Sequence, residues 1–501
     1  MKKNIFISFA FAATLLASAQ QKNTLLEPSF WKTNPAITAV QAEIGKGNNP
    51  SELNDRSFDP VVYAINGDAP IETIKFLLEQ PGNTVNKSTH DSRIYLHWAA
   101  SKGNTEIVNY LIAKGADINS EDSNGSAPLI FAANSGQNNT AIYDTFFKAG
   151  INPKKKYKDG ANLLLIAIPN DKDLSLSNYL ISKGLSLKDV DNNGNTAFNY
   201  AARNGNLSLL KTLLQKGVKY TDNALIIAAQ GSRRESNTIE VYKYLVEDLK
   251  IKPTALSTEG ETVLHFLTNK PKQIEIINYF LAKGVDANKA DKEGNTPLMK
   301  AATAKDTEAL ELLIPIVKNI NVQNNKGESA LTKAVQSETA NPVKLLLDKA
   351  ADAKVLDKDG NNLGYYLIQS YKPQSGRAPE AAGQKQDPFT AKMELLQDKG
   401  LNLATAQKDE STLYHLAVLK NDLVLLKNIS LLNIDINAKN KDGLTALHKA
   451  AMISKDDTIL KYLVSIGAKK DIITEFDESA YALAKENETL TKNNISVEFL
   501  K

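Results

Sequence analysis

Apolar residues recur along most of the chain in two alternating patterns, and both patterns predict short helices. The first is a compact apolar group closed by alanine, as in residues 298–301 (LMKA) and 447–450 (LHKA). The second places apolar pairs four residues apart, as in 276–277 (II) followed by 280–281 (FL). Residues four apart share one face of a helix, so the second pattern predicts an amphipathic helix with one buried side. The chain is therefore predicted to be a succession of helix pairs.

Short polar segments that end in glycine separate the predicted helix pairs. Examples are residues 291–294 (DKEG) and 357–360 (DKDG). Glycine adopts left-handed backbone angles without steric cost, so these segments predict tight turns that project from the helices. The residue before Pro297 is a threonine, which can accept a hydrogen bond from the first turn of the next helix while proline occupies the first helical position. Each turn is therefore predicted to lead directly into a helix.

The alanine that closes the first helix marks a repeat of about 33 residues. Ala301 and Ala334 are 33 residues apart, and so are Ala417 and Ala450. A second motif, seen in residues 114–117 (KGAD) and 283–286 (KGVD), keeps a constant distance from the first. A 33-residue period with a Thr-Pro-Leu-His-x-Ala phrase resembles the ankyrin repeat. Thirteen positions carry the marker: Ala64, Ala99, Ala132, Ala167, Ala201, Ala228, Leu267, Ala301, Ala334, Leu367, Ala417, Ala450 and Ala484.

The resemblance implies an all-α fold, an ankyrin-repeat solenoid of about thirteen helix-turn-helix repeats with short protruding β-turns or hairpins. Stacked repeats give a row of turns and a concave helical face. Four of the five histidines lie at the histidine position of the phrase, where the family uses this residue for hydrogen bonds at the turn–helix junction. Equivalent positions in adjacent repeats lie about 10 Å apart, too far to share a metal ion, so no metal site is predicted. These residues are His97, His265, His415 and His448.

Departures from the period divide the chain into predicted segments. The interval between Leu367 and Ala417 is 50 residues, and the excess is rich in proline and glycine, which predicts a flexible insertion. The intervals of 27 and 39 residues around Ala228 predict a missing turn before it and a longer loop, 231–237, after it. Residues 487–501 are expected to face solvent. The predicted segments are a signal peptide (1–19), an N-terminal capping unit (20–57), a first part of the array (58–368), the insertion (369–390), a second part of the array (391–476) and a C-terminal capping repeat (477–501).

The N-terminus has the three parts of a signal peptide. Lys2 and Lys3 precede an apolar run over residues 5–17, and small residues (ASA) fill positions 17–19. The run is shorter than the roughly 20 residues that span a bilayer, so the pattern predicts cleavage after Ala19 and no membrane insertion afterwards. We expect a periplasmic or secreted protein.

Composition limits the chemistry of the chain. Cysteine is absent, which excludes disulfides, thiolate metal sites and cysteine nucleophiles. With Lys2 and Lys3 removed, the net charge is about +1, so neither nucleic acid nor an anionic membrane is indicated as the partner. The sequence contains no glycine-rich phosphate loop, G-x-S-x-G elbow or H-E-x-x-H helix, so we predict neither an enzyme nor a cofactor.

The predicted function is binding of another protein through the turns and the concave face, by a monomer that acts as an inhibitor, protector or scaffold in the bacterial envelope. An alternative is a secreted effector that binds a host protein. Turn tips carry charges of both signs, which predicts a partner surface of mixed polarity. The candidate partner-binding residues are Asn192, Asn193, Lys292, Glu293, Lys358, Asp359, Lys441 and Asp442.

Two further features leave alternatives open. Lysines at 154, 155, 156 and 158 either form a solvated hairpin or contact an acidic surface of a partner. Aromatic residues after the histidine position either fill the space between helices or contact a ligand. The aromatic residues are Trp98, Phe131, Tyr200, Phe266 and Tyr366.

Overall fold

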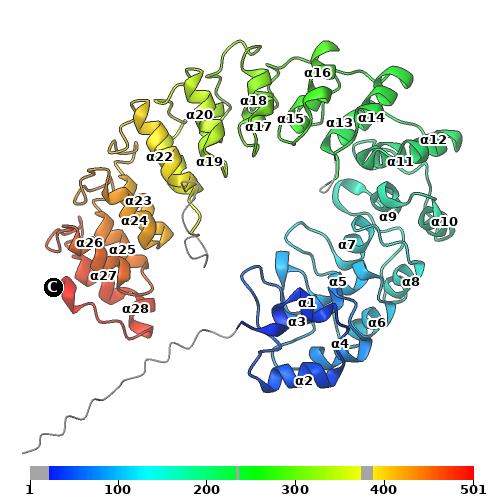
Figure 1. The fold of residues 1–501 in the computed structure, drawn as a ribbon, viewed down its shortest axis with the longest axis horizontal. Coiled ribbons are helices and arrows are strands. Elements are labelled where there is room, and N and C mark those ends of the chain that lie inside the picture. The colour runs from blue at the N-terminus through cyan, green and yellow to red at the C-terminus, as the bar shows by residue number, and fades with distance from the viewer. Residues whose placement is uncertain (1–21, 233–235, 374–386) are drawn as a thin grey trace, which may run out of the picture. The chain divides into compact units, whose positions relative to one another are not determined.

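The computed structural model describes residues 22–232, 236–373 and 387–501, and the predicted signal peptide lies outside them. The described residues form short helices joined by turns (Figure 1), with three isolated β-bridges and no strand in these ranges. The all-α prediction is therefore confirmed. The chain divides into two compact units, Met1–Ala201 with Ser208–Lys219, and Ala202–Leu207 with Tyr220–Lys501.

The first unit contains an N-terminal helical segment followed by paired helices. Its helices are α1 (Pro28–Trp31), α2 (Ile37–Gly45), α3 (Pro60–Asn66), α4 (Ile71–Leu78), α5 (Tyr95–Lys102), α6 (Thr105–Ala113), α7 (Pro128–Asn134), α8 (Thr140–Lys148), α9 (Leu163–Ala167), α10 (Ser175–Ser182), α11 (Ala197–Ala201) and α12 (Leu207–Gln215).

The second unit continues the alternation of a first and a second helix in each repeat. Its helices are α13 (Asn223–Gln230), α14 (Ile239–Lys243), α15 (Val263–Leu267), α16 (Ile274–Ala282), α17 (Pro297–Ala301), α18 (Glu308–Leu313), α19 (Ala330–Gln336), α20 (Asn341–Asp348), α21 (Leu363–Ser370), α22 (Pro388–Asp398), α23 (Leu413–Ala417), α24 (Leu423–Ser430), α25 (Ala446–Ile453), α26 (Thr458–Ser465), α27 (Ala480–Glu486) and α28 (Glu488–Lys492).

Within each unit the helices pack in two layers. In the first unit α3, α5, α7 and α9 contact one another in succession, and α4, α6 and α8 form the second row. The marker alanines Ala64, Ala99 and Ala132 are fully buried in the first row. Small side chains let neighbouring helices approach closely, so the apolar surface is buried between repeats rather than inside one. The second unit repeats this arrangement from α13 to α27.

The helix ends follow the predicted local chemistry. Asp59 accepts a hydrogen bond from the Val62 amide at 2.9 Å, and Pro60 occupies the first helical position. At the other end of the repeat, Gly115 and Gly284 follow the second helix with φ angles of 88° and 85°. A residue with a Cβ atom is strained at these angles, so glycine ends the helix at least cost.

The predicted insertion is narrower than expected. α21 extends to Ser370 and α22 begins at Pro388, so both ends of the segment 369–390 are helical. Asp387 accepts a hydrogen bond from the Thr390 amide at 3.1 Å, and this cap with proline at the first position starts α22 earlier than the pattern suggested. Residues 374–386 lie outside the described residues.

The expectation that residues 487–501 face solvent is wrong for Asn487, which is 8% exposed, and for three apolar side chains. Leu490, Val497 and Leu500 are each at most 5% exposed. α28 packs against α27, and the 3₁₀ turn Glu498–Leu500 contacts α27 as well. A terminal repeat has one apolar face with no further repeat against it, and these three residues contribute to covering that face.

Candidate protein-interaction surface

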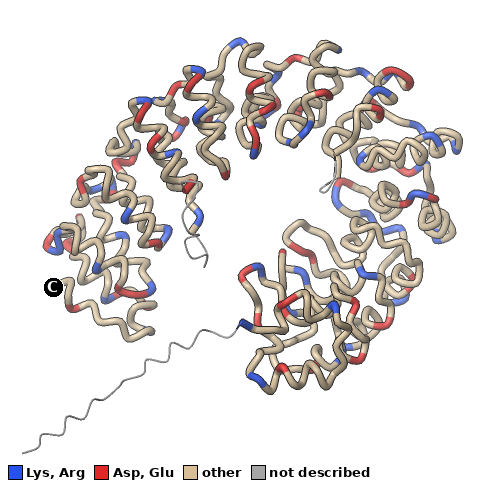
Figure 2. The backbone as a smooth tube through the Cα atoms, in the orientation of Figure 1, with Lys and Arg blue, Asp and Glu red and all other residues tan. Residues whose placement is uncertain are grey.

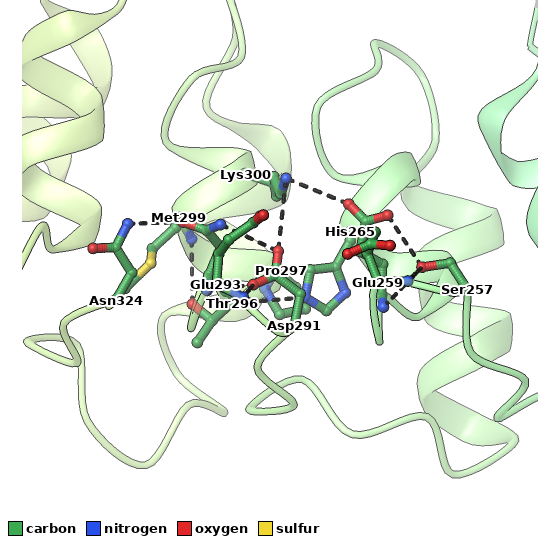
Figure 3. A network of polar contacts seen from close by, with 12 residues as sticks. Ser257, Glu259, His265, Asp291, Glu293, Thr296, Pro297, Met299, Lys300 and Asn324 are labelled. Carbon is green, nitrogen blue, oxygen red and sulfur yellow. Dashed lines mark hydrogen bonds and ion pairs between the residues drawn. The ribbon is translucent and has the colours of Figure 1, made fainter. Parts of the chain in front are cut away.

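Several turns between repeats are hairpins in which the side chain of the first polar residue accepts main-chain hydrogen bonds. In the hairpin that precedes α17, Asp291 accepts hydrogen bonds through Oδ1 from the amides of Glu293, at 3.0 Å, and Asn295, at 2.7 Å (Figure 3). The Asp291 amide also donates to the Asn295 carbonyl at 2.9 Å. Gly294 closes the turn with a φ of 82°. The tip residues between Asp291 and Gly294 are therefore held in place without the use of their own side chains.

The structure places all eight predicted partner-binding residues on exposed hairpin tips. Asn192 and Asn193 lie on one tip of the first unit, and the other six lie on three tips of the second unit. Figure 2 shows basic and acidic residues interspersed along both units rather than gathered by sign. The six tip residues of the second unit are Lys292, Glu293, Lys358, Asp359, Lys441 and Asp442.

Main-chain hydrogen bonds connect the tips of consecutive repeats. The Lys292 amide donates to the Glu259 carbonyl at 2.8 Å, and the Asn325 amide donates to the Glu293 carbonyl at 2.8 Å. The Lys358 amide continues the series with a bond of 2.9 Å to the preceding tip. In the first unit the Asn192 amide donates to the Asp159 carbonyl at 2.8 Å. Side chains on these tips therefore project from a backbone that is already ordered before a partner binds.

The four histidines of the repeat phrase join each helix to the next hairpin. His265 accepts the Thr262 amide hydrogen at Nδ1 (3.0 Å), so Nε2 carries the ring hydrogen and donates to the Asn295 carbonyl (3.1 Å). The predicted junction role is thus confirmed. Burial lowers the pKa of each ring, which keeps it neutral. Corresponding bonds occur at His97, His415 and His448.

A second link between hairpin and helix was not visible in the sequence. The Tyr366 hydroxyl donates to Asp357 at 2.6 Å, and Asp357 is the first residue of the hairpin nine positions earlier. Tyr200 donates to Asp191 at 2.9 Å in the same way, and the Trp98 indole donates to a threonine nine positions before it. Burial opposes ionisation of Asp357, but hydrogen bonds from Tyr366 and Asn361 hold its pKa below the usual value. In these three repeats the side chain that follows the histidine position of the repeat phrase therefore holds the hairpin against the first helix.

The aromatic residues at this position are mainly packing groups. Trp98 and Tyr366 are 8% and 7% exposed, while Phe131, Tyr200 and Phe266 are half-buried. Trp98 and Phe131 pack edge to face with ring centres 5.7 Å apart, and the guanidinium of Arg93 lies 5.3 Å and 4.4 Å from the two centres. Arg93 is itself buried and pairs with Asp122 at 2.9 Å. This arrangement leaves no vacant aromatic cage at these two rings.

The lysine cluster at 154–158 is exposed. Lys154, Lys155, Lys156 and Lys158 all face solvent, and none of the four forms an ion pair with another described residue. Lys155 donates to the side chain of Asn119 at 3.1 Å.

No group of three or more His, Cys, Asp or Glu residues within the described ranges has the arrangement of a metal site.

Among the described residues, no helix has both the length and the apolar character needed to cross a membrane.

Stacked helix pairs, hairpins joined by main-chain bonds and histidine junctions together define a helical repeat protein. The family model described as ankyrin repeats matches residues 61–157, 129–224 and 264–359, which together are just over half of the chain. The chain belongs to the ankyrin-repeat family.

Several curated proteins are similar to this chain over part of their length. Human transient receptor potential cation channel subfamily A member 1 is 24% identical over 424 residues, which are 83% of this chain and 34% of that protein. The putative ankyrin repeat protein FPV022 of fowlpox virus is 30% identical over 204 residues, 40% of this chain and 34% of that protein. Mask-1 of Caenorhabditis elegans, an ankyrin repeat and KH domain-containing protein, is 25% identical over 272 residues, 53% of this chain and 10% of that protein.

The chain spans between 10% and 34% of the length of these relatives, so their activities do not transfer to it. What they share with it is the repeat array. Ankyrin repeats form a protein–protein interaction module, and the fold itself is generally not catalytic.

Proposed function

We propose that this chain is an exported, non-catalytic binding protein that holds another protein against its hairpin tips and first-helix row. The observation that carries the proposal is the series of tips whose main chains are bonded to one another while their side chains stay exposed. A preordered surface loses little conformational entropy when a partner binds, so modest contacts give useful affinity.

The charges of the tips indicate the polarity of the partner. Lys292 lies beside Glu293, and Lys358 lies beside Asp359, so each tip presents both signs within two residues. A partner with alternating basic and acidic groups complements such a surface, and a uniformly charged polymer does not.

We infer the place of action from the sequence of the N-terminal segment. Residues 1–19 carry the sequence pattern of a signal peptide, which supports export to the periplasm or the exterior. In that compartment a monomeric binding protein would act as an inhibitor, protector or scaffold for another exported protein. Fractionation into periplasm, cell surface and medium separates this from action on a host protein.

The proposal is tested by reversing the tip charges. A variant with K292E, E293K, K358E and D359K keeps the main-chain bonds, and K344E with D348K is a matched control because it reverses an exposed ion pair on α20. Full-length protein is cross-linked in envelope extracts, and captured proteins are identified. We expect the tip variant to lose a partner that the wild type and the control retain. Capture of the same proteins by all three, or of no specific protein, contradicts the proposal.

A further inference from the structure

Three of the four methionines lie in the described part of the chain, and their exposure differs widely. Met452 is 50% exposed, whereas Met299 and Met393 are 2% and 6% exposed. Met1 belongs to the predicted signal peptide, outside the described residues. The chain contains no cysteine, so methionine thioethers are its only sulfur groups. Among the described residues, Met452 therefore carries the thioether that is most open to oxidants dissolved in the solvent.

Met452 occupies a position that accepts polar side chains in other repeats. It lies one residue before the end of α25, where Ala450 and Ala451 are buried and Met452 faces solvent. The residue two positions after the marker alanine is Thr303 in one earlier repeat and Gln336 in another, and both are exposed. A polar group at this position is therefore compatible with the packing of the repeats.

The surface next to Met452 is apolar. Ile453 follows it in the sequence and is 42% exposed. Leu419 is 52% exposed, and the 3₁₀ turn Val418–Lys420 that carries it packs against α25 in the same unit. An oxygen atom added to the sulfur would place a strongly polar group on this apolar surface.

We propose that Met452 is a site of oxidation to methionine sulfoxide by hydrogen peroxide and related two-electron oxidants. A lone pair of the thioether sulfur attacks one peroxide oxygen and the O–O bond breaks. That oxygen stays on the sulfur, and the second oxygen leaves as water with both protons. The sulfur loses two electrons and the peroxide gains them. The product is polar and chiral, so the surface at the end of α25 becomes polar, as it is in the repeats that carry Thr303 and Gln336.

The test oxidises the full chain with dilute hydrogen peroxide, once folded and once in concentrated urea. Mass spectrometry of tryptic peptides follows each methionine, because cleavage after lysine places the three in separate peptides, 293–300, 393–399 and 450–455. Met299 and Met393 are therefore internal controls in every sample. We expect folded Met452 to react at least about tenfold faster than either control, since a buried thioether reacts only when its surroundings open.

Urea separates exposure in the folded state from local unfolding. The rate at Met452 should change by less than about threefold in urea, because its side chain is already exposed. The rates at Met299 and Met393 should rise at least about tenfold, because unfolding exposes both thioethers.

Two variants test the consequence for the surface. M452L keeps the side-chain volume without the sulfur, and M452Q carries the side chain found at Gln336. Oxidation of Met452 alone should leave the circular dichroism melt unchanged. It should also shorten retention of the folded chain in hydrophobic interaction chromatography toward that of M452Q, whereas M452L should keep its retention after the same treatment.

Equal rates at the three methionines of the folded chain would overturn the inference. A Met452 rate that rises with urea in parallel with the other two would do the same, since oxidation would then require unfolding. A lowered melt or an unchanged retention after oxidation of Met452 would contradict the assigned change of the surface. None of these outcomes bears on capture by the hairpin tips, which charge reversal tests separately.

Discussion

Replacement of His97 by alanine should destabilise the first unit by about 3 kcal/mol. The ring is fully buried, accepts the Ile94 amide hydrogen at 3.2 Å and donates to the Ser126 carbonyl at 3.0 Å. Alanine leaves the buried amide of Ile94 without its acceptor, which costs about 1–3 kcal/mol. Loss of the second hydrogen bond and of ring packing against Phe131, whose centre lies 6.0 Å away, adds about 1 kcal/mol.

The assay is urea unfolding of the full chain followed by tryptophan fluorescence. Both tryptophans, Trp31 and Trp98, lie in the same unit as His97, so the signal reports that unit. With a slope of about 3 kcal/mol per molar urea, the midpoint should fall by about 1 M. His90→Ala is the control, because this fifth histidine is half-buried on a hairpin and lies outside the helix junction. A midpoint shift no larger than that of the control refutes the reasoning.

The same substitution has a defined pH dependence. Burial lowers the pKa of His97, so the folded state keeps the ring neutral while the unfolded chain takes up a proton below about pH 6.5. The free energy of unfolding of the wild type should therefore be highest above pH 6.5. It should fall as the pH drops from 6.5 toward the lowered pKa of the folded state, by at most about 1.4 kcal/mol per pH unit for each imidazole. The stability difference between wild type and H97A should shrink over this window, and a widening difference contradicts the assigned ring state.

Three further substitutions test the hairpins and the buried polar groups. Glu410 has a φ of 62° where most hairpins carry glycine, so Glu410→Gly should stabilise the second unit by about 0.5–1 kcal/mol and raise its urea midpoint, followed by circular dichroism; a lower midpoint is against this. Tyr366→Phe removes the hydrogen bond to Asp357 and should lower the free energy of unfolding by about 1 kcal/mol, measured by a circular dichroism melt. An unchanged melt would show that this bond does not stabilise the fold. Asp59→Ala removes a helix cap and the carboxylate that lies 2.8 Å from the Lys87 ammonium, which keeps only its neutral acceptors on Ser51 and Asn83. We expect a loss of about 3–5 kcal/mol by urea unfolding, and a loss below about 1 kcal/mol would show that the pair is not needed.

Local chemistry predicted the helices and turns because each depends on neighbouring residues. Thr296 before Pro297 starts a helix, and Gly294 closes a turn, in any surroundings that permit them. The family resemblance then supplied the stacking order of the repeats and the role of the four histidines.

The features that the sequence did not predict depend on contacts between distant or unlike residues. The links from Tyr366 to Asp357 and from Trp98 to Thr89 share a spacing of nine residues, but they use different donors and acceptors, so no residue pattern marks them. Residues 487–501 look polar because only a few apolar side chains are scattered among them. Burial of Leu490 comes from packing of α28 on α27, which a sequence pattern of this length does not specify.

The residues that hold a hairpin in its conformation are different from those whose side chains are exposed at its tip. Asp291 and Gly294 fix the turn, and the amide of Lys292 bonds to the preceding tip, but the side chains of Lys292 and Glu293 support none of these contacts. Exposed side chains without such a role usually change stability by less than about 0.5 kcal/mol when replaced. Charge reversal at Lys292 and Glu293 should therefore leave the unfolding midpoint unchanged while partner capture is lost. A large drop in stability would mean that these tips are part of the folding core, and the assignment of binding to them would have to be abandoned.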